Sequence, residues 1–95
     1  MEITIDGEAI KCEADFHGAI AKALNLSPYY GKNLDALWDV LSTDVERPVT
    51  LVWKNSQLSK VSLAENFEKI MAVLKRVESQ DADWGLDEKF SVKLV

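Results

Sequence analysis

The sequence predicts an α/β fold in which a three-stranded parallel β-sheet is covered by helices, in two layers. Three short segments have strand character, and helical patterns separate them along the chain. The expected order, β-α-α-β-α-β, places helices between strands, which favours parallel pairing through right-handed crossovers. With no internal repeat, linker or low-complexity segment, residues 1–95 are expected to form one domain.

The spacing of apolar residues indicates first a strand and then a helix. Ile3 and Ile5 alternate with polar residues, as in a strand with one buried face. Asp6-Gly7 is typical of a turn. From Asp15 to Leu24 the apolar residues recur at helical spacing, and Asp15 is a candidate N-cap for that helix.

A loop and a second helix follow. Residues 25–31 predict a loop because Pro28 breaks the first helix and Gly31 permits a positive φ. Asn33 is a candidate N-cap for a helix over about residues 34–43. One face of that helix is apolar and comprises Leu34, Leu37, Trp38 and Leu41.

The next strand follows Pro48, which should stop any helix. Val49–Trp53 is a run of β-favouring apolar residues, as expected of a strand buried on both faces. Residues 55–60 are polar and leave room for one short helical turn. Ser62 and Glu65 form a candidate capping box for a helix that continues to about residue 79.

The last segments are a polar stretch and a strand. Residues 80–89 are polar, and Asp81–Gly85 within them are expected to form a solvated loop. The carboxylates in Asp81–Gly85 are too few for a calcium loop. A final strand is indicated by the alternation of Phe90, Val92 and Leu94 with polar residues.

The composition suits a soluble globular chain, with 47% hydrophobic and 28% charged residues. We see no apolar run long enough to cross a membrane and no secretory signal. Cys12 is the only cysteine, so an internal disulfide is excluded. These features favour a cytoplasmic protein, which we expect to be a monomer when free.

The net charge of −5 comes entirely from the first half of the chain. Residues 1–48 hold nine acids and four bases, whereas residues 49–95 hold seven of each. Such a field argues against nucleic-acid binding, which needs a basic patch. It would speed encounter with a cationic protein. The alternative is that the acidic charge serves only solubility.

A candidate binding surface lies on the second helix and the loop before it. Asp35, Asp39 and Ser42 fall at i, i+4 and i+7, on a face separate from the apolar one. Two aspartates one turn apart repel each other, and only Asp35 lies close enough to the helix start to gain from the helix dipole. Tyr29 and Tyr30 precede this face and are either interface residues or loop anchors.

The sequence gives little support to metal binding, phosphate binding or catalysis. His17 is the only histidine and is interpreted as structural. With Cys12 alone beside it, His17 has too few companions for a metal site. Gly31-Lys32-Asn33 lacks the other residues of a phosphate loop. Carboxylates on an exposed helix face lack the cleft that separates catalytic pKa values, so we expect neither an enzyme nor a cofactor.

The stretch from Tyr29 to Leu41 resembles the signature of the barstar family, small intracellular inhibitors of secreted bacterial ribonucleases. An aromatic pair, a glycine, Asn33-Leu34-Asp35 and Leu37-Trp38-Asp39 carry the resemblance. The order of strands, prolines and helices agrees with that family over nearly the whole chain, so the resemblance implies a barstar-like fold.

The resemblance implies an inhibitor that plugs the cationic active site of a barnase-type ribonuclease with residues 29–42. Asp39 would replace a substrate phosphate and accept hydrogen bonds from arginine and histidine side chains. Asp35 would pair with cations near the rim. The remaining contacts would come from Tyr29, Tyr30, Gly31, Asn33, Leu34, Trp38, Ser42, Val73 and Arg76, although Trp38 fits a core position better.

Two positions depart from the family pattern. Arg76 stands where barstar has a glutamate, and Asp44 stands where it has a tryptophan. These departures suggest that the cognate enzyme differs from the family's usual one. An alternative is an interaction or immunity module of the same fold whose basic partner is not a ribonuclease.

Overall fold

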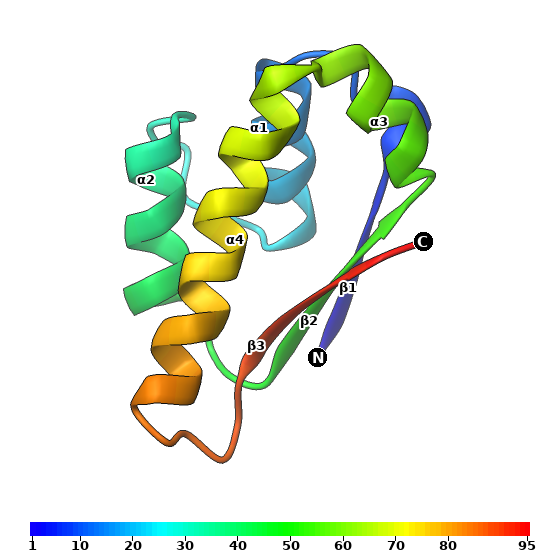
Figure 1. Ribbon diagram of the computed structural model, residues 1–95. Helices are drawn as coiled ribbons and strands as arrows, with labels where there is room; N and C mark the ends of the chain where they lie inside the picture. The colour runs from blue at the N-terminus through cyan, green and yellow to red at the C-terminus, as the bar shows by residue number, and fades with distance from the viewer.

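Three parallel strands form a single sheet in the order β1-β2-β3 in the computed structural model, which describes residues 1–95 (Figure 1). The strands are β1 (Glu2–Asp6), β2 (Val49–Lys54) and β3 (Phe90–Leu94). The register places Trp53 opposite Ile5 on one side and Leu94 on the other. The predicted α/β class and the parallel sheet are confirmed.

Helices cover one face of this sheet, which gives the two layers expected (Figure 1). They are α1 (Glu13–Ala23), α2 (Leu34–Asp39) with its π-helical extension η2 (Val40–Asp44), and α4 (Glu65–Asp83). A 3-10 turn, η1 (Gly7–Ala9), and helix α3 (Ser56–Leu63) pack together at the end of the sheet. No helix is long and apolar enough to cross a membrane.

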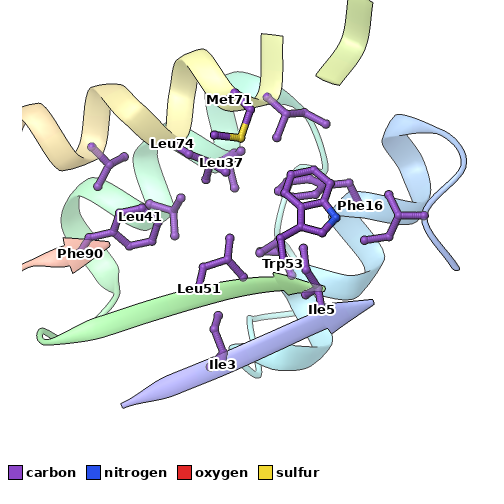
Figure 2. Packing of buried hydrophobic residues seen from close by; sticks show 14 of the residues in the cluster. Ile3, Ile5, Phe16, Leu37, Leu41, Leu51, Trp53, Met71, Leu74 and Phe90 are labelled. Carbon is purple, nitrogen blue, oxygen red and sulfur yellow. The ribbon is translucent and has the colours of Figure 1, made fainter. Parts of the chain in front are cut away.

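The core lies between the sheet and the helices (Figure 2). Ile5 and Trp53 point from the strands toward the helical layer, where Phe16 of α1 and Phe67 of α4 pack against the Trp53 ring. Leu37 reaches the same cluster from α2 and is fully buried. Because α2 contributes to the main core, its position is fixed by hydrophobic burial.

The expectation that β2 is buried on both faces is wrong. Val49, Leu51 and Trp53 are buried, but Thr50 and Val52 on the opposite face are only half-buried. The outer face of the sheet carries no helix, so neighbouring strands alone shield these two side chains. The prediction failed because helices cover only one face of the sheet.

The start of α1 also differs from the prediction. The helix begins at Glu13 after Cys12, which makes no side-chain capping bond. Asp15 lies inside the first turn, and its carboxylate accepts from the Lys11 N–H at 3.1 Å. The helix ends at Ala23, and Asn25, with φ of 52°, turns the chain toward the loop that precedes α2.

A buried polar contact joins α3 to the end of β1. The Ser59 hydroxyl donates to the Gly7 carbonyl at 3.0 Å and accepts from the Trp53 indole at 3.1 Å. A Cβ on Gly7 would lie 2.2 Å from the Asn55 carbonyl oxygen, so only glycine fits. Residues 56–63 form a complete helix that packs here, whereas the sequence predicted one short turn at most.

The predicted capping box of Ser62 and Glu65 is wrong because Ser62 belongs to α3. The break between α3 and α4 falls at Ala64, with φ of 51° and ψ of −124°. An L-residue with a Cβ is strained in this region, which glycine adopts freely.

The solvated loop expected over Asp81–Gly85 is also wrong in part, because α4 continues to Asp83 and Asp81 is fully buried. Asp81 accepts from Arg47 Nε at 2.8 Å and from the Phe90 N–H at 2.7 Å. Burial would raise the pKa of Asp81, but these bonds and the Arg47 charge hold it below the ordinary 3.8. The stabilisation from this pair is therefore present above the ordinary pKa and lost as pH falls through the lowered one.

Ala64→Gly should increase the free energy of unfolding by about 1 kcal/mol, because it relieves a strained φ. Urea unfolding monitored by circular dichroism measures the change. Ala72→Gly, at an exposed interior position of α4, is the control and should lower stability by about 1 kcal/mol. Equal losses in both variants would contradict the assignment of strain to Ala64.

Candidate functional site

The loop before α2 is held from inside by Tyr30. This side chain is buried, with 8% of its surface exposed, and its hydroxyl lies 2.7 Å from Nδ1 of His17 on α1. Tyr29, in contrast, is 93% exposed, and its N–H donates to the Ser27 hydroxyl at 3.1 Å. The two tyrosines therefore have different roles: the position of Tyr30 fits the loop anchor, while Tyr29 is available to a partner.

A buried network extends from Tyr30 into α1. His17 is buried, as its interpretation as a structural histidine required, and its Nε2 lies 2.9 Å from a Glu13 carboxylate oxygen. With Nε2–H donating to Glu13, Nδ1 accepts from the Tyr30 hydroxyl when the ring is neutral. Burial, together with the charge of Glu13, raises the pKa of Tyr30 to about 12.

The chain reverses direction at Lys32. The predicted positive φ at Gly31 is wrong: Lys32 adopts φ of 52°, and Gly31 does not lie in that region. A Cβ on Gly31 would lie 3.1 Å from the Ala36 Cβ, tighter than ordinary contact. A side chain at position 31 would therefore need a small shift of Ala36, because the loop approaches α2 closely there.

Helix α2 begins as the sequence predicted. The Asn33 side chain accepts from the Ala36 N–H at 2.8 Å, which satisfies one of the free donors of the first turn. After Asp39 the helix widens into η2, where the Val45 N–H donates to the Val40 carbonyl at 3.1 Å. Isolated π turns of this kind recur at functional sites.

Asp35 and Asp39 are exposed on α2, and neither carboxylate forms an ion pair or a hydrogen bond within the chain. The two ion pairs of the protein are those of His17 with Glu13 and of Arg47 with Asp81. The acidic face of α2 therefore presents unneutralised charge, and a cationic partner could supply the hydrogen bonds that it lacks.

The backbone carbonyl of Asp39 accepts hydrogen bonds from two side chains. Ser42 and Thr43 both donate to it, at 3.3 and 2.5 Å. Thr43 is exposed and Ser42 is half-buried. The helical spacing predicted Ser42 as a site residue, and the structure adds Thr43 beside it, because no sequence signal marked the π turn.

Trp38 of α2 and Arg76 of α4 meet where the acidic face of α2 adjoins α4. The Arg76 Cζ lies 3.9 Å from the centroid of the Trp38 ring, a cation–π contact. Trp38 is half-buried and packs against the core, as do Leu34 and Val73 beside it. The sequence-predicted residues on α2 and α4 thus meet on adjoining helices, with Arg76 stacked on an aromatic ring of the candidate surface.

The candidate surface is defined as Tyr29, Gly31, Asn33, Leu34, Asp35, Trp38, Asp39, Ser42, Thr43, Val73 and Arg76. It combines exposed acids on a short, capped helix with one exposed aromatic side chain in the loop before that helix. No group of three or more His, Cys, Asp or Glu residues is arranged to hold a metal ion. Fold and surface together define a small α/β protein with an exposed acidic helix face.

Comparison with known proteins agrees with this description. The family described as Barstar (barnase inhibitor) matches residues 1–94, so the chain belongs to the barstar family. A Bacillus subtilis (strain 168) protein named "Putative ribonuclease inhibitor YrdF" is 34% identical over 82 residues. The aligned region covers 86% of this chain and 90% of that protein.

The raised pKa of Tyr30 can be measured directly in Tyr29→Phe, where Tyr30 is the only tyrosine left. Ultraviolet absorption of the phenolate should rise with a midpoint near pH 12. The pKa of Tyr30 in the folded protein exceeds its ordinary value of 10.0. The stabilisation from Tyr30 should therefore be complete below pH 10.0 and be lost as the pH rises toward the raised pKa.

Tyr30→Phe, with Tyr29 as its only tyrosine, supplies the reference curve for an exposed phenol. Circular dichroism at each pH establishes that the protein remains folded during the titration. A Tyr30 midpoint near 10 in the folded protein would contradict the buried anchor.

Proposed function

We propose that this protein is a non-enzymatic inhibitor that blocks the active site of a cationic, barnase-type ribonuclease inside the cell. The unpaired carboxylates of Asp35 and Asp39, exposed beside Tyr29, are the observation that carries the proposal. Membership of the barstar family and the ribonuclease-inhibitor name of the B. subtilis relative support the same role.

The chemistry of the proposed contact follows from charge. A ribonuclease holds the phosphates of RNA with cationic side chains, and a carboxylate offers acceptor oxygens of similar charge. Asp39 takes the place of one phosphate in the enzyme cleft, and Asp35 pairs with cations nearer the rim. Because the contact excludes water, these charge-assisted hydrogen bonds are stronger than they would be on a free surface.

Rigidity of the surface adds to affinity. The Asn33 cap fixes the first turn of α2, and the Tyr30 hydroxyl holds the loop before it. Leu37 anchors the other side of α2 in the core. Since these contacts exist in the free protein, binding costs less conformational entropy than it would for a mobile loop.

Titration of ribonucleases with the purified protein tests this function. RNA cleavage by at least one barnase-type enzyme in a representative panel should fall to zero near equimolar inhibitor. If no enzyme in the panel is bound or inhibited, the ribonuclease assignment is wrong, and a basic partner of another kind becomes the better hypothesis.

Asp39→Ala should weaken binding most, by several kcal/mol, because it leaves buried cations of the enzyme unpaired. Barnase and barstar are the reference example for such charge pairs, so this magnitude is carried over from the family. Asp35→Ala and Tyr29→Ala should each cost more than about 1 kcal/mol. Calorimetry gives the affinities, and thermal melting shows that each variant is folded.

The matched control for these variants is Asp87→Ala, which removes an exposed carboxylate in the loop between α4 and β3. It should leave affinity nearly unchanged. Equal losses for Asp39→Ala and Asp87→Ala would mean that the docking face lies elsewhere.

Arg76→Glu should tighten binding to a barnase-type enzyme by about 1 kcal/mol or less, because it restores an acid at a solvent-screened rim. The change also removes the cation–π contact with Trp38. Arg76→Ala, which loses the contact without adding charge, isolates that effect. Weaker binding by Arg76→Glu than by Arg76→Ala would show that the enzyme does not face this position with positive charge.

A further inference from the structure

A hollow lies beside the candidate surface. Its volume is about 540 Å³, and it lies between the loop that follows α1 and the segment from Val40 to Glu46. Ligand pockets in proteins commonly have volumes of about 300–1,000 Å³. The exposed Tyr29 lines this hollow and also belongs to the candidate surface, so the two are continuous.

The hollow has an apolar wall and an acidic edge. Leu24, Leu26, Val40 and Val45 provide aliphatic lining, whereas Asp44 and Glu46 are exposed and carry charge. Neither acid forms an ion pair within the chain. The only hydrogen bond to either carboxylate comes from the Thr43 hydroxyl, 3.2 Å from Asp44.

The amino terminus and Arg47, which lie near the hollow, already have hydrogen-bond partners within the chain. The amino group of Met1, which also lines it, donates to the Pro48 carbonyl at 2.9 Å. Arg47 follows Glu46 but is directed to the buried Asp81, with Nε at 2.8 Å. No basic side chain lines the hollow, so the carboxylates of Asp44 and Glu46 have no internal cation.

We propose that this hollow receives an arginine or lysine side chain from the rim of the bound ribonuclease. The inference rests on the proposed function and adds a second recognition site to it. An aliphatic stem ending in a cation matches both parts of the hollow: the stem packs on the leucine and valine wall while the charged head lies between Asp44 and Glu46. Such amphipathic side chains abound on a cationic enzyme.

The site also gives a reason for one departure from the family. Asp44 stands where barstar has a tryptophan, so the acidic edge of the hollow departs from the family pattern. A basic residue on the enzyme at this position would distinguish the cognate partner from an enzyme that presents an apolar group there. The hollow thus contributes to specificity, in the sense of a difference between affinities.

Charge reversal at the edge tests the proposal with a barnase-type ribonuclease that the wild-type chain inhibits. Asp44→Lys combined with Glu46→Lys should weaken binding at least tenfold, mainly through faster dissociation. Glu8→Lys combined with Glu65→Lys makes the same change in net charge at two exposed positions away from the hollow. This control should slow association and leave the dissociation rate nearly unchanged.

A second measurement identifies the occupant. Each arginine and lysine on the enzyme surface is replaced by alanine and combined with the neutral pair Asp44→Asn and Glu46→Gln in a double-mutant cycle. One basic residue should show coupling of fivefold or more. The neutral pair adds no repulsion, and circular dichroism confirms that each variant is folded.

The outcomes separate this proposal from the proposed function. If the wild-type chain binds no ribonuclease, both are wrong. If it binds, but the two charge-reversed pairs dissociate at the same rate or no basic residue couples to the edge, the hollow has no role and the inhibitor assignment stands.

Discussion

The hydrogen bond between the Tyr30 hydroxyl and the buried His17 holds the loop that leads into the candidate surface. It joins the loop before α2 to the middle of α1 across 2.7 Å, and Glu13 holds the far side of the imidazole. Three residues after Tyr30, the Asn33 side chain starts α2. The loop that leads into α2 is therefore held by a contact wholly inside the protein, while Leu37 holds the helix itself in the core.

The two aspartates on the exposed face of α2 lower the stability of that helix. Asp35 and Asp39 lie one turn apart without a cation, at a cost of about 0.2–0.5 kcal/mol in an isolated helix. The core beneath compensates, because Leu37 is fully buried and Trp38 packs beside it. The proposed contact residues Asp35 and Asp39 and the core residue Leu37 thus occupy different sides of one helix.

The sequence predicted the elements that periodicity and local capping determine. The three strands, their parallel order and the Asn33 cap could be predicted because each depends on spacing or on a nearby side chain. The buried state of Asp81 could not, because its partner Arg47 lies 34 positions away in the sequence. The strained break at Ala64 and the π turn after Asp39 carry no residue-level signal at all.

The candidate surface was predictable in part for the same reason. Helical spacing placed Asp35 and Asp39 on one face, and the structure leaves both exposed. Spacing could not separate Tyr29 from Tyr30, since the burial of Tyr30 depends on His17, which belongs to another helix. The hollow beside Tyr29 was also missed because its two walls come from segments that tertiary packing alone brings together.

Occupation of the enzyme's active site is the central claim of this account, and competition with a nucleotide tests it most directly. The affinity of the protein for an inhibited barnase-type ribonuclease is measured by calorimetry at increasing concentrations of a mononucleotide bound in the enzyme's cleft. If the acidic face of α2 fills that cleft, the apparent Kd should rise in proportion to nucleotide concentration once the cleft is saturated. An affinity that is unchanged by saturating nucleotide would contradict the account and place the contact outside the active site.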